Sequence, residues 1–295
     1  MGQFVDINGI AVSATIKLSS PATREFWEIP VLFEDELLLA LDKPSGLLTA
    51  NDLNESERPS LMGLLHAAIA AGKSLATERG LTYLNPAHRL DAETSGVILL
   101  AKSKPALEVL ANQFGTDQPQ AKYVALVRGV PRAEQFEVDA KIAPDPITPG
   151  LMRVDSRQGK QAKTLVSVLE TFRDYVWLAC RPVTNRTHQI RVHLRHTGLP
   201  ITGDALYGGK PLLLSRLKRD YRLKPGRTER PLLERVALHA AELTVVHLVT
   251  GKPVTFTAPL PKDLRVALKY LREHAGTSFS RHDPSEDEQA DPSLG

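Results

Sequence analysis

The first residues that could do chemistry form a polar string, HRLDAETSG, at residues 88–96. The string stands directly before an apolar run, residues 96–101, that has the composition of a buried strand. Loops that enter a strand are held by a rigid scaffold and often carry catalytic groups. The aspartate of this string, Asp91, could therefore be such a catalytic group. An isolated Asp-x-x-Thr turn also satisfies backbone amides, so the string alone does not assign a function.

The second such string, RTHQIRVHLRH, occupies residues 186–196 and is followed by Gly198. Its pattern predicts a helix that Thr187 caps and Gly198 ends, with Ile190 and Leu194 on one inward edge and the polar residues on the exposed faces. Arg191 falls at the margin between core and solvent. A guanidinium there can reach a partly buried carboxylate, so we expect a bidentate pair between Arg191 and Asp91.

Three histidines in nine residues also raise the possibility of a metal site, with His88 and Asp91 as further ligands. The three are His188, His193 and His196. Their spacing does not place two ligands at i and i+4 with an acid between them, and no cysteine pair supplements them. Ser95 lacks the Gly-x-Ser-x-Gly elbow of a serine hydrolase. We therefore predict no metal site and no hydrolase nucleophile.

The apolar pattern predicts the elements that position these strings. Residues 31–33 and 37–41 form an expected β-hairpin leading to a Lys-Pro-Ser-Gly loop at residues 43–46. Further strands are expected at residues 121–127, 164–172, 175–181, 241–249 and 253–258. Helices are expected behind Ser60, behind Ser103 and at residues 261–274. There is no sustained βαβ rhythm and no repeat. We therefore predict an α+β fold with a mixed, largely antiparallel central sheet and flanking helices.

At 295 residues, 42% of them apolar, the chain can bury a sizeable core. No stretch approaches the roughly 18 apolar residues of a membrane span, and the first residues lack the pattern of a secretion signal. These features predict a soluble, cytoplasmic protein that does not bind membranes. The single cysteine, Cys180, lies in an apolar run and is expected to be a buried, inert thiol.

The net charge of +3 is unevenly distributed along the chain. Residues 276–295 carry a net charge of −4, so the rest of the chain carries +7. This tail is rich in serine, proline and acids and is predicted to be disordered. Residues 208–235 hold nine Lys or Arg against three acids and are predicted to be a surface insertion. Such a segment is either a solvated surface or an arm that contacts phosphates.

Taken together, four stretches resemble the RluA-type pseudouridine synthases, in the order found in that family. They are DKPSG (42–46), HRLDAETSG (88–96), KYVALVRG (122–129), and RTHQIRVHL (186–194) continuing through PITGDALYG (200–208). The resemblance extends from about Phe33 to Pro261. It implies the pseudouridine synthase fold with an RNA-binding cleft. One departure is Asn185, which stands where the family usually has glycine. Because Asn tolerates a left-handed backbone, we expect no loss of activity.

The resemblance also implies a role for individual residues. Asp91 matches the catalytic aspartate, Tyr123 the active-site tyrosine, and Arg191 the arginine paired with that aspartate. Arg89 matches the arginine that enters the RNA when the target base leaves the stack. Other predicted RNA contacts are Lys43, His88, Thr94, Arg186 and His188. The implied partner is a structured ribosomal or transfer RNA, bound by a monomer that uses neither cofactor nor metal.

The resemblance suggests three parts. Residues 1–30 form an N-terminal extension, at most a partial remnant of an S4-like RNA-binding module, with Asp6 to Gly9 as its trace. Residues 31–275 form the catalytic domain, which includes the basic insertion 208–235. Residues 276–295 form the acidic tail.

The reaction implied is the isomerisation of uridine in RNA. The bond between uracil N1 and ribose C1′ is cut, the base turns, and a bond forms between C1′ and C5. Asp91 could attack C1′, attack the uracil ring or abstract the C2′ proton, and the sequence does not separate these routes. One alternative is a catalytically silent RNA-binding protein, which would keep its full effect when Asp91 is changed. The other is a metal-dependent hydrolase, which a chelator would inactivate.

Overall fold

The computed structural model describes residues 4–5, 11–12, 14–52, 57–116, 119–224 and 226–276. The proposed trace of an S4-like module at Asp6 to Gly9 and the acidic tail after Gly276 lie outside these residues. Two short strands near the N-terminus, β1 (Phe4–Val5) and β2 (Ala11–Val12), pair antiparallel with each other.

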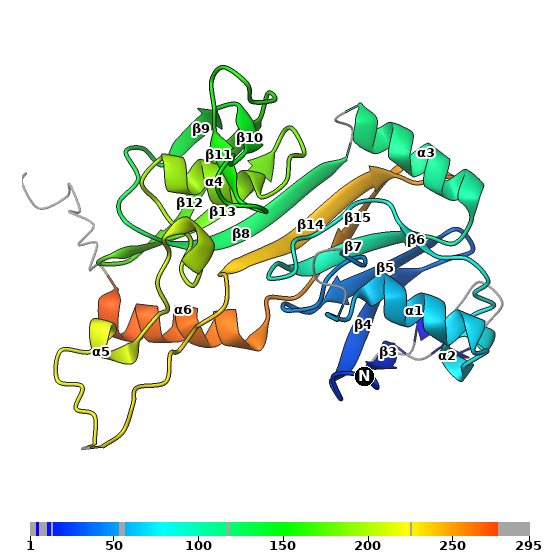
Figure 1. Ribbon diagram of the computed structural model, residues 1–295, viewed down its shortest axis with the longest axis horizontal. Helices are drawn as coiled ribbons and strands as arrows, with labels where there is room; N and C mark the ends of the chain where they lie inside the picture. Colours follow the sequence, from blue (N-terminus) through cyan, green and yellow to red (C-terminus); the bar gives the residue numbers. More distant parts are fainter. Residues whose placement is uncertain are drawn as a thin grey trace, which may run out of the picture.

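One mixed sheet of eleven strands runs through the molecule (Figure 1). Its main path has the order β3-β4-β5-β7-β14-β8-β13-β12-β9, with β6 paired to β7 and β15 paired to β14. The strands are β3 (Thr15–Ser19), β4 (Phe26–Glu34), β5 (Leu38–Lys43), β6 (Asn85–Pro86), β7 (Ser95–Ala101), β8 (Gln120–Arg128), β9 (Gln135–Asp139), β12 (Lys163–Thr171), β13 (Tyr175–Pro182), β14 (Leu238–Val246) and β15 (Pro253–Thr257). Within the described chain, only β7 and β14 pair parallel. The predicted mixed, largely antiparallel sheet is confirmed.

Helices cover both faces of this sheet. They are α1 (Leu61–Ala70), α2 (Ser74–Thr77), α3 (Lys104–Gly115), α4 (Gln189–His196), the 3-10 turn η2 (Ala205–Tyr207), α5 (Leu214–Leu217) and α6 (Lys262–Ala275). Ser60 and Ser103 cap α1 and α3 by accepting hydrogen bonds from backbone amides three residues on. A separate hairpin, β10 (Ile142–Pro144) and β11 (Met152–Val154), packs beside α4 (Figure 1). Of the helices in the described segments, none is long and apolar enough to cross a membrane.

The core is divided into two halves that meet at the centre of the sheet. One half packs α4 and α6 against β8 and β13, and the other packs α1 against β4, β5 and β7. The side chain of Tyr123 on β8 contacts both halves. On the opposite face of β5 and β7 lies α3. The centre of the sheet is therefore the place where groups from the two halves of the chain can be brought together.

The parallel contact between β7 and β14 explains a glycine in the first polar string. Gly96 lies opposite Ala240 in the register, with φ of +115°. A Cβ at position 96 would lie 2.2 Å from the carbonyl oxygen of Ala240. Only glycine permits this close approach, which fixes where the loop before β7 meets β14.

The basic insertion is not wholly a surface segment, which corrects the prediction. Leu212, Leu217 and Leu233 belong to the core, and an amide–carbonyl hydrogen bond from Leu212 to Leu233 closes its base. The short helix α5 lies against α6 (Figure 1). Most of the described residues in the middle of the insertion, 218–224 and 226–230, are exposed. At the other end of the chain, β4 runs through the domain boundary expected at residues 30–31.

Cys180 is fully buried on β13, and burial raises the pKa of its thiol to about 12. A thiol that stays protonated is unreactive, as expected.

Candidate active site

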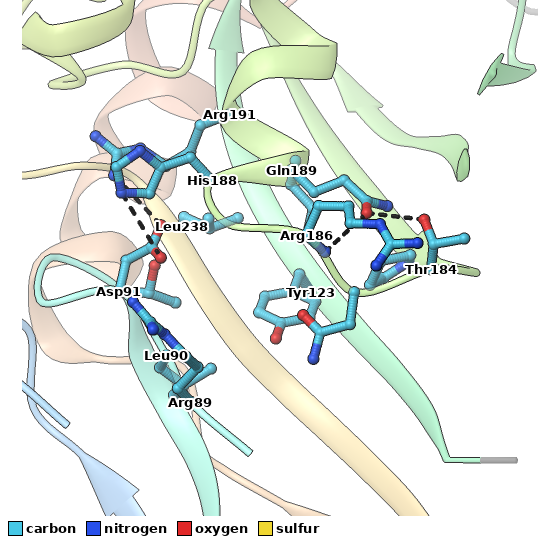
Figure 2. A pocket seen from close by; sticks show the side chains of 14 residues that line it. Arg89, Leu90, Asp91, Tyr123, Thr184, Arg186, His188, Gln189, Arg191 and Leu238 are labelled. Atoms are coloured by element: carbon cyan, nitrogen blue, oxygen red, sulfur yellow. Dashed lines mark hydrogen bonds and ion pairs between the residues drawn. The ribbon is translucent and has the colours of Figure 1, made fainter. Parts of the chain in front are cut away.

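A pocket opens at the centre of the sheet, where the two polar strings face each other. Its lining comes from the loop before β7, from β8, from the segment joining β13 to α4, and from the start of β14. Figure 2 shows Asp91 under Arg191 and His188, with Arg89 beside it and Tyr123 between Asp91 and Arg186 in this view. The other labelled lining residues are Leu90, Thr184, Gln189 and Leu238.

The loop that carries Asp91 is fixed on both sides of that residue. The hydroxyl of Thr49 donates to the carbonyl oxygen of Leu90 at 2.8 Å and lies 3.2 Å from its amide nitrogen. The amide of Thr94 donates to the carbonyl of Asp91 at 3.1 Å. The carboxylate itself retains 20% side-chain exposure. Asp91 is therefore held in place yet open to a ligand in the pocket.

Lys43 lies against this loop and is completely buried. Its ammonium donates to the carbonyl oxygens of Pro44, Leu47 and Ala92, at 2.9, 2.7 and 3.1 Å. Burial lowers the pKa of Lys43 to about 7. The predicted RNA contact of Lys43 does not fit this buried position. Two of its bonds, to Pro44 and Leu47, stay within its own loop, and the third, to Ala92, joins that loop to the Asp91 loop.

Arg191 lies on α4 and contacts two carboxylates. Its Nε and Nη2 bind Asp204 in a bidentate pair at 2.7 and 2.8 Å, and its Nη1 lies 3.3 Å from Oδ2 of Asp91. The structure thus brings Arg191 and Asp91 together, but the bidentate partner is Asp204. The buried environment of Arg191 was also not expected, since the helix was predicted to expose its polar residues. Gln189 and His193 are buried as well.

His188 stands at the N-terminus of α4 in a left-handed conformation with φ of 54°. The helix begins one residue later, so the predicted cap at Thr187 is wrong. Asn185 does not have a positive φ, and the left-handed residue of this segment is His188. The Nε2 atom of His188 lies 3.9 Å from Oδ1 of Asp91, and its Nδ1 lies 2.8 Å from the hydroxyl of Tyr207. Burial lowers the pKa of His188.

The opposite wall of the pocket is organised by Gln189. Its Oε1 accepts from the hydroxyl of Thr184 and from the amide of Arg186, and its Nε2 donates to Lys163 and Thr164 on β12. The exposed Arg186 donates from Nε to the carbonyl of Gln161. These bonds fix the segment between β13 and α4 at the pocket's edge.

Tyr123 lines the pocket from β8, opposite Cys180 and Ala240 in the register. Burial, and secondarily the negative charge of Asp91, raise the pKa of its phenol well above the usual range. The hydroxyl is therefore protonated at neutral pH. Arg89 is exposed at the rim, and Thr94 is buried in the lining.

His88 is separated from this pocket. Its Nε2 accepts a hydrogen bond from the amide of Leu99, and its ring stacks on Phe114 at a centroid distance of 5.2 Å. Burial lowers its pKa to about 4. The predicted RNA contact of His88 does not fit this position, which is a packing position against α3.

The three histidines of the second string do not gather around one point. His193 is buried between the hydroxyl of Thr164 and the carbonyl of Ala140, whereas His196 is exposed at the end of α4. Among the described residues, no three His, Cys, Asp or Glu side chains are placed to hold a metal ion together.

Two residues at the site had no expected role, Asp204 and Tyr207. Both occur in the string PITGDALYG. Nothing in their spacing shows that this turn folds back against α4. The available signal was an aspartate and a tyrosine within a glycine-flanked turn that immediately follows the arginine helix.

Comparison with known proteins agrees with this fold. Residues 37–196 match the family model described as RNA pseudouridylate synthase. Ribosomal large subunit pseudouridine synthase D of Zymomonas mobilis is 33% identical over 259 residues, covering 87% of this chain and 77% of that protein. Synthase C of Yersinia pestis is 35% identical over 251 residues, covering 83% and 70%.

Among solved structures, human RNA pseudouridylate synthase domain containing 4 superimposes with a TM-score of 0.60 and 26% identity, covering 82% of this chain and 92% of that one. The alternative of a catalytically silent RNA-binding protein is not favoured by these relatives. The chain therefore belongs to the RNA pseudouridylate synthase family and is an RNA pseudouridine synthase.

Proposed function

We propose that this enzyme isomerises uridine in structured ribosomal RNA, with Asp91 as its essential carboxylate. The supporting observation is the placement of Asp91 in the open pocket, between Nη1 of Arg191 and Nε2 of His188. The names of the relatives, ribosomal large subunit pseudouridine synthases C and D, support ribosomal rather than transfer RNA as the substrate.

The reaction requires an ionised carboxylate beside ribose C1′ and C2′ while the base turns within a closed space. The Nη1 atom of Arg191 lies 3.3 Å from Oδ2 of Asp91 and so places a positive charge beside that carboxylate. Because Arg191 engages Asp91 through a single nitrogen, the carboxylate keeps lone pairs for a substrate. All three routes open to Asp91 use the negative charge of its carboxylate. They are attack at C1′, attack on the uracil ring and removal of the C2′ proton.

Tyr123 is proposed to be the platform under the uracil. Its ring lies in the pocket lining and offers a flat apolar surface. Because its phenol stays protonated at neutral pH, Tyr123 is a poor base in its resting form. Its position and pKa therefore support stacking and hydrogen bonding to the base rather than removal of the C5 proton.

The RNA is proposed to reach the pocket past Arg89, Arg186 and the basic insertion. Arg89 and Arg186 are exposed at the rim, and Thr94 and His188 line the pocket beneath them. Flipping a uridine out of a folded RNA costs a few kcal/mol, which contacts to phosphates can offset. The exposed cations of the insertion would supply further such contacts outside the pocket.

The proposal also includes action as a monomer, without metal or cofactor, in the cytoplasm. It retains a catalytic domain followed by an acidic tail, but not the boundary at residues 30–31, because β4 crosses it.

Mapping pseudouridine in ribosomal and transfer RNA from cells with and without this gene tests the proposal. We expect at least one position in large-subunit ribosomal RNA to lose its pseudouridine when the gene is deleted, and to regain it on complementation. Loss confined to transfer RNA would contradict the proposed substrate.

A further inference from the structure

Two buried residues outside the pocket lining contact both groups that face Asp91. Asp204 binds Arg191, and Tyr207 binds His188 and also packs against Arg191. We propose that Asp204 and Tyr207 are positioning residues of the isomerisation, which orient Arg191 and His188 so that each presents one nitrogen to a different oxygen of Asp91. This inference rests on the proposed role of Asp91.

Asp204 determines which part of the guanidinium remains available. It takes Nε and Nη2 of Arg191 in a bidentate pair, and its side chain is only 1% exposed. Nη1 is then the nitrogen left for Oδ2 of Asp91. The ring of Tyr207 lies 5.0 Å from the guanidinium carbon and holds it from one side. A free arginine would form its preferred bidentate pair with Asp91 and occupy both carboxylate oxygens.

Asp204 also sets the charge next to Asp91. Arg191 and Asp204 together carry no net charge, so the group of three retains the negative charge of Asp91 for the substrate. If Asp204 became neutral, Asp91 would be the nearest counter-ion of Arg191. Arg191 would then stabilise the carboxylate of Asp91 more strongly in the resting enzyme than in the transition state. That difference slows the reaction.

Tyr207 determines which nitrogen of His188 faces Asp91 with a proton. The amide of Met152 donates to the Tyr207 hydroxyl at 3.0 Å, so that hydroxyl is free to donate its own proton to Nδ1 of His188 at 2.8 Å. Burial raises the pKa of Tyr207 to about 12, which keeps that proton on the phenol. A neutral imidazole that accepts at Nδ1 carries its proton on Nε2, the atom 3.9 Å from Oδ1 of Asp91.

The backbone conformation beside Asp204 and at His188 indicates that the fold fixes the positions of these residues. His188 adopts a left-handed φ that is costly for a residue with a Cβ, and such strain persists where surrounding contacts hold it. Gly203, just before Asp204, has φ of +78°, and a Cβ there would lie 2.0 Å from the carbonyl oxygen of Arg235. Tyr207 itself is 1% exposed, packed among Ile142 and Val192.

The test uses Asp204→Asn and Tyr207→Phe. Each variant keeps the shape of the side chain, and the first removes the charge whereas the second removes the hydroxyl. Single-turnover rates would be measured with the substrate RNA at increasing enzyme concentration. We expect the maximal rate to fall by about 100-fold for Asp204→Asn, as misplacement of a reacting group by about 1 Å does. A smaller fall is expected for Tyr207→Phe. The enzyme concentration at half-maximal rate should change less than about twofold, because neither side chain lines the pocket.

Asp263→Asn is the matched control for the charge, since Asp263 also forms a bidentate pair, with Arg235 at 2.6 and 3.0 Å. Tyr270→Phe is the control for the hydroxyl. Both controls should retain the wild-type rate. Asp91→Asn, measured in the same assay, separates the proposed role of Asp91 from the proposed positioning role of Asp204 and Tyr207. If Asp91→Asn is fully active, the proposed function fails.

If Asp91→Asn is inactive while Asp204→Asn and Tyr207→Phe keep the wild-type maximal rate, the positioning inference is overturned. Reduced binding with an unchanged maximal rate would overturn it as well. Should Asp204→Asn not fold, Tyr207→Phe alone decides, because loss of one hydroxyl leaves the Arg191–Asp204 pair intact.

Discussion

At the scale of residues, the site depends on how Arg191 divides its donors between two carboxylates. Two of its nitrogens neutralise the buried Asp204, and the third reaches Asp91. One guanidinium therefore links a structural carboxylate to the proposed catalytic one. Its removal should affect both stability and rate.

We predict that Arg191→Leu lowers the isomerisation rate more than tenfold and destabilises the fold. The charge of Asp204, which is 1% exposed, would be left buried without its partner, at a cost of about 3 kcal/mol. Urea unfolding and single-turnover kinetics measure the two effects. Arg195→Leu, at an exposed position of the same helix, is the control and should change neither. Wild-type activity in Arg191→Leu would show that the contact with Asp91 is not used.

The residues of the site were predictable from the sequence only in part. The order of the motifs placed Asp91, Tyr123 and Arg191 in one pocket, and the structure brings them together. The bidentate partner was misassigned because a sequence does not show which of several acids lies opposite a guanidinium. Lys43 and His88 were assigned to RNA because they stand in motifs that resemble those of the family. Their burial depends on long-range packing that local spacing does not encode.

At the scale of elements, the parallel contact between β7 and β14 holds the Asp91 loop. A buried histidine, His239, lies at this contact. The Nδ1 atom of His239 lies 3.0 Å from the hydroxyl of Ser95, and its Nε2 lies 3.3 Å from the carbonyl of Ala258. Burial lowers the pKa of His239 to about 4. With its proton on Nε2, facing the Ala258 carbonyl, the neutral ring accepts at Nδ1 from Ser95, and because protonation reverses that bond the junction is expected to weaken in acid.

We therefore predict that His239 makes folding stability fall as the pH drops from about 6.5 to about 4. In this window the unfolded chain takes up a proton that the folded chain does not, so the free energy of unfolding decreases by up to about 1.4 kcal/mol per pH unit. Denaturant unfolding at several pH values should give a shallower slope for His239→Gln than for wild type. His196→Gln, at an exposed position, should keep the wild-type slope. Parallel curves for His239→Gln and wild type would contradict the prediction.

The basic insertion provides the second prediction at this scale. If it contacts RNA phosphates, neutralising Arg216, Lys218, Arg219 and Arg222, all of which are exposed, should weaken binding. The slope of log affinity against log salt should become shallower by up to about 0.9 per lost contact, and the rate on saturating RNA should barely change. RNA titration at several salt concentrations measures the slope, and the isomerisation assay at saturating RNA measures the rate.

The control for that experiment removes the same charge elsewhere, through Lys73, Lys104, Lys252 and Lys269, which are exposed on other elements. This second quadruple variant should keep the wild-type salt slope. Equal slopes for the insertion variant and wild type would mean that the insertion is only a solvated surface.

Most of the larger elements were predictable because their apolar periodicity is strong, as in β5, β7 and α1. The strand predicted at residues 241–249 is instead β14, Leu238–Val246, because pairing with β7 and β8 draws in residues 238–240. β3, β9 and the β10–β11 hairpin were not predicted. They are short or have mixed polarity, and partner strands rather than their own composition determine them.

At the scale of the whole molecule, the site exists because two halves of one sheet meet. The loop that carries Asp91 comes from the half that contains β5 and β7, and the helix that carries Arg191 comes from the half that contains β8 and β13 (Figure 1). Tyr123 packs against both. Asp91 and Arg191 are 100 residues apart in the sequence, so their contact depends on the assembly of β7, β14, β8 and β13 at the centre of the sheet. The function and the fold are therefore linked through a single long-range contact.

The most direct test of this account is the isomerisation rate of Asp91→Asn on the ribosomal RNA identified by mapping. The amide keeps the shape of the side chain and removes its charge. We predict that single-turnover conversion becomes undetectable, while the thermal unfolding temperature and most of the RNA affinity are retained. A variant that keeps even a tenth of the wild-type rate has lost only about 1.4 kcal/mol of transition-state stabilisation, and that result would contradict the assignment of Asp91 as the essential carboxylate.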